Sequence, residues 1–95
     1  MDAHILVVED DPSIRETTQL GLESAGFAVE TAVDGEDGLA RFRHRRPDLV
    51  LLDVMLPKRD GLEVCRIIRR DSAVPVIMLT ARSDAIDVVV GLESG

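Results

Sequence analysis

The chain has 95 residues, of which 45% are hydrophobic, so it is long enough for one small domain with its own core. Its net charge of −7 argues against a nucleic-acid surface, and two phenylalanines without Trp or Tyr offer no platform for stacked bases. A single cysteine excludes an intrachain disulfide, and the absence of a basic leader or a long apolar stretch predicts a cytoplasmic protein without membrane contact.

Strand-like and helix-like segments alternate along the first half of the chain. Residues 5–8 are aliphatic without a polar break, which is typical of a parallel strand covered on both faces. Asp11 can cap a helix that opens at Pro12, and Gly26 can end it. The residues expected on its inner face are Ile14, Thr18, Leu22 and Ala25. Residues 28–32 alternate in polarity and are predicted to form an edge strand.

The second half continues the alternation. Residues 49–52 and 76–79 are again unbroken aliphatic runs of strand length. Helices are predicted after Asp34, after Asp60 and over residues 84–93. Their inward positions are Leu39 and Phe42, then Leu62, Cys65 and Ile68, then Ile86, Val89 and Val90. The order βαβαβαβα indicates a parallel α/β sheet with right-handed crossovers.

Polar side chains follow the carboxyl ends of these strands. They are Glu9 and Asp10 after the first strand, Asp53 after the third and Thr80 after the fourth. Because parallel strands end at one edge of a sheet, we expect these groups to converge. Asp53 carries the most weight, since it interrupts an apolar stretch where an unpaired charge is costly.

The mutual repulsion of converging carboxylates must be offset by protonation, by solvent or by a metal ion. Two of them about 4 Å apart repel by roughly 4 kcal/mol at an effective dielectric near 20. Hard oxygen ligands suit Mg²⁺ and phosphate, whereas zinc favours His or Cys, and neither type follows these strands. The pattern predicts a Mg²⁺-dependent phosphate site in which an aspartate can act as nucleophile. Asp11 is interpreted as a helix cap and not as a ligand.

Other reactive side chains are better explained by structure. The arginines within residues 41–46 lie late in a predicted helix, where cations complement the helix dipole, and His44 among them is expected to be exposed. His4 lies near the terminus without a visible partner. Cys65 is expected to act as a small core residue.

The segments ILVVEDD, DLVLLDVMLPKRDGLEV and VPVIMLTAR resemble the receiver domain of two-component response regulators, in the same order and spacing. The resemblance implies a flavodoxin-like, doubly wound sheet of order 2-1-3-4-5. It implies that a sensor histidine kinase phosphorylates Asp53, so the chain is a phosphoacceptor that assists its own phosphoryl transfer and dephosphorylation, and not an enzyme. Mg²⁺ would bind Glu9, Asp10, Asp53 and the backbone carbonyl of Met55. Thr80 would be the switch hydroxyl.

The family pattern continues with a fifth strand, ending in Lys-Pro, and a fifth helix. Lys58 does not match that lysine, so we expect residues 1–95 to be a receiver domain of four βα units, truncated before the fifth strand. Residues 76–79 would then form an exposed sheet edge that invites self-association. The motifs resemble receivers of winged-helix transcription factors, so a DNA-binding output domain is expected beyond Gly95.

Two other classes stay open. A Mg²⁺-dependent phosphohydrolase of the haloacid-dehalogenase type also uses a strand-end aspartate as nucleophile. It wants a second aspartate two residues on, where this chain has Met55. A dinucleotide-binding module wants a glycine-rich turn after the first strand, and VVEDDPS contains no glycine.

Overall fold

Parallel strands and helices alternate in the computed structural model, which describes residues 3–56 and 60–79. The strands are β1 (His4–Val8), β2 (Ala28–Ala32), β3 (Leu49–Asp53) and β4 (Val76–Leu79). The helices are α1 (Pro12–Ser24), α2 (Gly35–His44) and α3 (Gly61–Asp71). The sheet order is β2-β1-β3-β4, which confirms the predicted α/β class and places the predicted edge strand β2 at an edge. The predicted helix over 84–93 lies outside the described residues.

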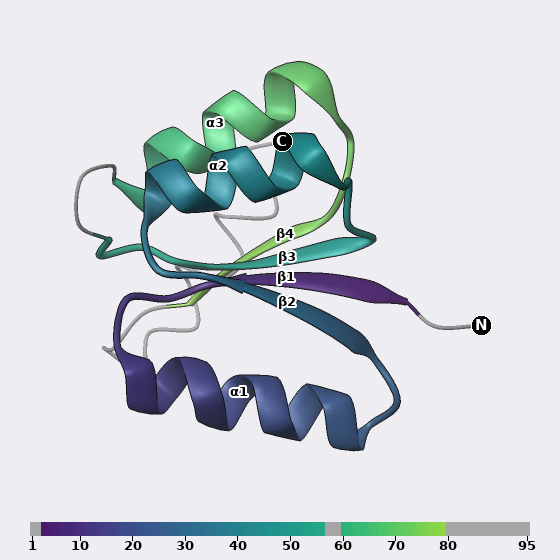
Figure 1. The fold of residues 1–95 in the computed structure, drawn as a ribbon. Coiled ribbons are helices and arrows are strands. Elements are labelled where there is room, and N and C mark those ends of the chain that lie inside the picture. Colours follow the sequence, from purple (N-terminus) through teal and green to yellow (C-terminus); the bar gives the residue numbers. More distant parts are fainter. Residues whose placement is uncertain (1–2, 57–59, 80–95) are drawn as a thin grey trace.

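The sheet is sandwiched between unequal layers, with α2 and α3 on one face and α1 on the other (Figure 1). The larger core lies under α2 and α3. Strands contribute Leu6, Val8, Val50, Leu52, Val76 and Met78, and helices contribute Leu39, Phe42, Val64, Cys65 and Ile68. Within the described part of the chain, no helix is long and apolar enough to cross a membrane.

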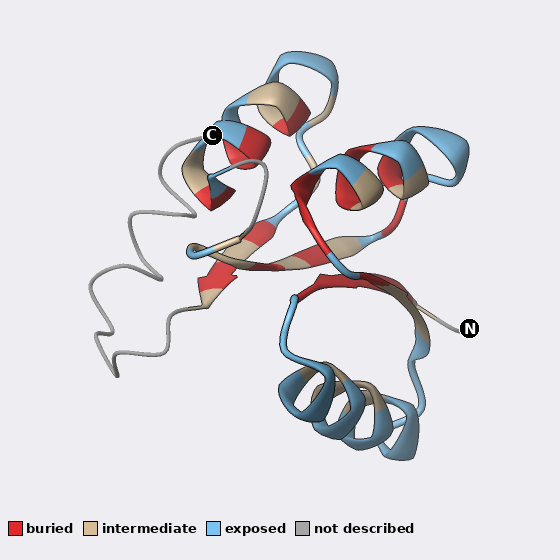
Figure 2. Cartoon of the chain, turned by 60° about the vertical axis from the view of Figure 1, so that its left-hand side comes forward, coloured by how far each residue is buried: buried red, intermediate tan, exposed pale blue. Residues whose placement is uncertain are grey.

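The α1 layer is thin. Figure 2 shows α1 almost entirely exposed or half-buried, and none of its residues is buried. Ile14, predicted to face inward, is 48% exposed, and Ala25 is exposed as well. That part of the prediction is wrong because α1 packs against β1 and β2 only along part of its apolar face. Leu22 and Thr18 are the half-buried members of the predicted face.

Each of the three described helices begins after an aspartate cap, as predicted. Asp11 accepts hydrogen bonds from two backbone N–H groups in the first turn of α1, at 2.8 and 3.0 Å. Asp34 and Asp60 cap α2 and α3 in the same way. Gly26 follows the last turn of α1 with a φ of 98°, a conformation that glycine adopts at little cost. Local sequence therefore sets where these helices begin.

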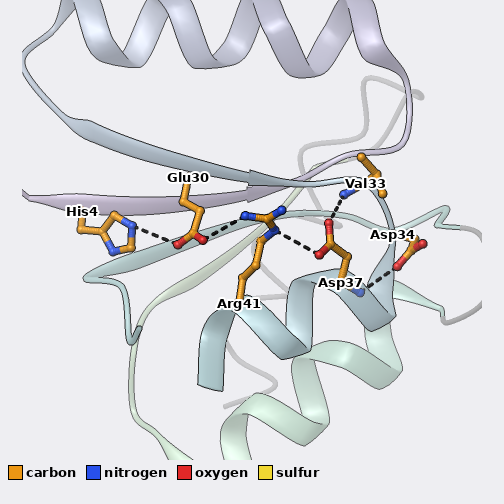
Figure 3. A network of polar contacts seen from close by, with 6 residues as sticks. All are labelled: His4, Glu30, Val33, Asp34, Asp37 and Arg41. Carbon is orange, nitrogen blue, oxygen red and sulfur yellow. Dashed lines mark hydrogen bonds and ion pairs between the residues drawn. The ribbon is translucent and has the colours of Figure 1, made fainter. Parts of the chain in front are cut away.

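A chain of polar contacts links β1, β2 and α2 (Figure 3). His4 is 6% exposed, and its Nε2 lies 3.5 Å from a carboxylate oxygen of Glu30. Arg41 bonds Glu30 at 3.1 Å and Asp37 at 3.0 Å, and Asp37 accepts the backbone N–H of Val33 at 3.1 Å. Arg41 is therefore not merely a solvated cation near the end of α2. Its bonds to Glu30 and Asp37 connect α2 to β2, the strand that precedes it.

His4, for which the sequence shows no partner, lies at ion-pair distance from Glu30, although neither of its ring nitrogens makes a hydrogen bond to the described residues. Besides its contact with Glu30, its backbone N–H donates to the carboxylate of Asp48 at 2.8 Å. Both partners are distant in the sequence and become neighbours only when β1 pairs with β2 and β3. His4 therefore joins the amino-terminal ends of the sheet.

The Arg41 network should be measurable in stability. We expect Arg41→Met to lower the free energy of unfolding by about 1 kcal/mol, because its two partly exposed ion pairs are each worth roughly 0.2–1 kcal/mol. Urea unfolding followed by circular dichroism measures this. Arg43→Met, at an exposed position of the same helix, is the control and should change stability by less than about 0.5 kcal/mol. Equal losses in the two variants would contradict a role for the network.

Candidate functional site

Three carboxylates lie together at the carboxyl edge of the sheet. Glu9 and Asp10 follow β1, and Asp53 is the last residue of β3. These strands are parallel neighbours in the register Val8↔Leu52, so their ends are adjacent. Oxygens from the three carboxylates lie within 4.8 Å of one another. Within the described residues, this is the one group of acidic, His or Cys side chains close enough to share a metal ion.

Backbone pairing holds the two strand ends in place. The N–H of Glu9 donates to the carbonyl of Ala32 at 3.0 Å, which extends the pairing of β1 with β2. Asp53 pairs with Leu79 of β4, and one of its carboxylate oxygens accepts the N–H of Met55 at 3.1 Å. The site therefore rests on the central strands of the sheet, and its position does not depend on a long loop.

Glu9 is the most deeply buried member, at 6% exposed. Burial is the main cause that raises the pKa of Glu9 to about 7. The hydrogen bond from the N–H of Asp11, at 3.1 Å, lowers this pKa, while the carboxylates of Asp53 and Asp10 raise it. Near neutral pH the site thus retains a proton in part of the molecules, and a bound cation would displace it.

The adjacent residues Asp10 and Asp11 have different roles. Asp10 belongs to the carboxylate group, whereas Asp11 directs its Oδ1 to the first turn of α1. The predicted cap at Asp11 is confirmed. Met55 lies two residues after Asp53 and is 63% exposed. Thr80 and Lys58 lie outside the described residues, so the predicted switch hydroxyl stays a prediction.

The remaining reactive side chains have structural roles. Cys65 is fully buried, and burial raises the pKa of its thiol, which disfavours a nucleophile. His44 is exposed, as predicted. Arg46 donates to the carbonyl of Asp71 at 2.9 Å and lies over the ring of Phe42, 5.0 Å from its centroid. Arg46 thus joins the ends of α2 and α3.

Gly61 is a supporting residue that sequence reasoning missed. It is the first residue of α3, and its N–H donates to the carbonyl of Val54 at 3.0 Å. A Cβ at this position would lie 2.4 Å from the carbonyl oxygen of Asp53 and 2.8 Å from Cα of Val54. Gly61 is therefore required for space, because the start of α3 packs directly on the backbone that carries Asp53. The sequence feature that could have indicated this role is a glycine at the start of a helix, where alanine would be more favourable.

The comparisons with known proteins agree with one another. A family model described as the response regulator receiver domain matches residues 5–95. The transcriptional regulatory protein CseB of Streptomyces coelicolor is 63% identical over 92 residues, covering 97% of this chain and 39% of that protein. The DNA-binding response regulator MtrA of Mycobacterium tuberculosis is 52% identical over 95 residues, covering 100% of this chain and 42% of that protein. The chain thus spans less than half the length of these relatives.

Solved structures give the same result. The receiver domain of the Francisella response regulator 1452 matches with a TM-score of 0.88 and 29% identity, covering 99% of this chain and 78% of that one. The chemotaxis response regulator CheY4 of Vibrio cholerae matches with a TM-score of 0.89 and 34% identity, covering 100% of this chain and 82% of that one. The chain therefore resembles these proteins in its fold as well as in its sequence.

The close approach at Gly61 leads to a test. Gly61→Ala should lower the free energy of unfolding by about 1–3 kcal/mol, since the methyl group meets backbone atoms that cannot rotate away. Gly21→Ala is the matched control: it lies in α1 with nothing within 4 Å of the added Cβ, and should raise stability by about 0.5–1 kcal/mol. Thermal and urea unfolding of both variants and of wild type measure these changes in stability. A neutral Gly61→Ala variant would show that α3 can move away from Asp53.

The raised pKa of Glu9 predicts how metal-free stability depends on pH. The folded state holds the Glu9 proton up to a pKa of about 7, against an ordinary value of 4.5, so ionisation destabilises the folded state across that interval. Wild type should therefore lose stability as pH rises through this range, relative to Glu9→Gln, which cannot ionise. Melting temperatures in EDTA between about pH 5 and about pH 8 measure the difference. Parallel curves for the two proteins would refute it.

Proposed function

The chain belongs to the response regulator receiver domain family, and on this basis we propose that Asp53 accepts a phosphoryl group from a sensor histidine kinase. The observation that carries the proposal is the meeting of Glu9, Asp10 and Asp53 within 4.8 Å at the carboxyl edge of the sheet. Asp53 is half-buried at the end of a central strand, which keeps its carboxylate in one place. The comparisons give no support to a haloacid-dehalogenase-like phosphohydrolase.

The residues at this edge fit Mg²⁺, which receiver domains generally bind at an acidic pocket. All three side chains offer hard oxygen atoms, and Asp10 is exposed, which leaves room for the water molecules that Mg²⁺ keeps. We propose Glu9, Asp10, Asp53 and the backbone carbonyl of Met55 as its ligands. When bound, the ion would neutralise charge between the attacking carboxylate and the phosphoryl group.

Each residue then has a distinct part in the transfer. A carboxylate oxygen of Asp53 attacks phosphorus as the bond from phosphorus to the kinase histidine breaks, and the imidazole leaves. The product is an acyl phosphate, and a phosphoryl group adds roughly −1.5 to −2 charges at neutral pH. Thr80, which follows Leu79 in the chain, would bond this group and so pass the change beyond β4. The domain also assists its own dephosphorylation in this proposal.

The output belongs to a longer protein. Two relatives are named as a transcriptional regulatory protein and a DNA-binding response regulator, and this chain matches less than half of each. We propose that residues 1–95 form the receiver part of such a regulator, in the cytoplasm, with a DNA-binding output domain that the receiver controls. Receiver domains are generally signalling modules and not enzymes. Self-association along β4 stays a prediction.

The phosphoacceptor role is tested directly. The protein at its full natural length is incubated with acetyl phosphate and Mg²⁺, and the acid-labile phosphoryl group is mapped by mass spectrometry. Asp53→Asn should abolish labelling, and EDTA should abolish it in wild type. Asp11→Asn is the matched control, since asparagine caps a helix about as well as aspartate, and it should be labelled like wild type. Labelling of Asp53→Asn at the wild-type level would disprove the assignment.

A further inference from the structure

Arg15 contacts the turn after β1, which carries two of the site's carboxylates, those of Glu9 and Asp10. It is a half-buried residue of α1, and its Nη1 donates to the backbone carbonyl of Glu9 at 3.0 Å and to that of Asp10 at 3.3 Å. These two residues are the members of the carboxylate group contributed by the β1 end. One guanidinium nitrogen thus holds both of their peptides.

The choice of acceptor matters. An arginine beside an acidic group would ordinarily form a paired bond with a carboxylate, which would occupy the oxygens that a cation needs. Arg15 bonds main-chain oxygens, so its guanidinium takes up no carboxylate oxygen of Glu9 or Asp10 in these bonds. Its charge also lies close to a site that holds three acids, which offsets part of their mutual repulsion.

The turn needs such an anchor at Asp10. Glu9 is buried and its N–H is bonded to Ala32, so the sheet fixes its position. Asp10 is exposed, so little side-chain packing fixes its peptide. Past Asp10 the chain is held again, because the N–H of Asp11 donates to the Glu9 carboxylate and Asp11 caps α1. The Arg15 bonds bridge the weakly held residue between these points.

We propose that Arg15 is a positioning residue for the cation site: it fixes the peptides of Glu9 and Asp10 so that their carboxylates stay directed at Asp53. The inference rests on the proposed function, since it assigns a role in Mg²⁺ binding at the same site. Arg15 itself contacts neither the cation nor the phosphoryl group in this proposal. Its contribution is to order the carboxylates before the cation arrives.

Magnesium titration of four proteins tests the proposal. Because the chain contains no Trp or Tyr, backbone amide NMR shifts report binding better than fluorescence does. Arg15→Met should weaken Mg²⁺ binding by roughly tenfold, the lower end of the loss when an outer-shell partner of a metal ligand is removed. Arg15→Lys keeps a cationic donor and should recover part of the loss. Arg43→Met, which removes the same charge at an exposed position of α2, should change the affinity by less than about twofold.

A second readout separates positioning from overall stability. In metal-free protein, amide hydrogen exchange at Asp11 should be faster in Arg15→Met than in wild type, because the turn loses its anchor. The titrations are run well below the melting temperature of each variant, so a loss of stability alone cannot mimic weaker binding. Should Arg15→Met fail to fold, Arg15→Gln replaces it with the same expected changes.

The outcomes separate the positioning role of Arg15 from the proposed Mg²⁺ site on which it rests. If wild type binds Mg²⁺ and the variant lacking the Arg15 guanidinium binds it equally well, the positioning role is overturned and the proposed site stands. Equal weakening by Arg15→Met and Arg43→Met also overturns it, because net charge alone would then explain the effect. If wild type does not bind Mg²⁺, the proposed metal site is wrong and the inference is rejected with it.

Discussion

The parallel pairing of β1 with β3 is the constraint on which the site depends. It places the end of one strand, with Glu9 and Asp10, beside the end of another, with Asp53, so three carboxylates share a small volume. Their mutual repulsion and the burial of Glu9 are costs that the metal-free fold carries. Such a cost persists only where the surrounding structure holds the groups together. The same cost makes the edge receptive to a cation.

The surroundings of the site reduce that cost in several ways. The described helices α1, α2 and α3 each follow the carboxyl end of a strand, so their amino-terminal ends, which carry partial positive charge, lie toward the acidic edge. Gly61 lets α3 approach the backbone of Asp53, and Arg15 adds a full positive charge that bonds main-chain oxygens. At the opposite edge the last turns of α2 and α3 carry arginines, and Arg46, which follows α2, donates to a terminal carbonyl of α3. The layer formed by α2 and α3 is therefore electrically polarised along the strands.

Neighbouring residues of the same type divide the work by geometry. Asp10 and Asp11 are consecutive, yet only Asp10 belongs to the carboxylate group, because Asp11 is committed to the first turn of α1. The sheet fixes the placement of these groups, with Asp53 at the end of β3 and Glu9 and Asp10 in the turn after β1.

The sequence by itself determined the features that depend on neighbouring residues. Aliphatic runs marked the strands, aspartates marked the helix starts, and acids after successive strands indicated a shared edge, since parallel strands must end together. Tertiary structure alone decided several contacts: Glu30 against His4, Gly61 against the backbone of Asp53, and Arg15 against the carbonyls of Glu9 and Asp10. It also decided that Ile14 is exposed, because apolar spacing identifies a helix face but not how far that face lies over the sheet. Such contacts are set by the packing of elements and leave no local pattern in the sequence.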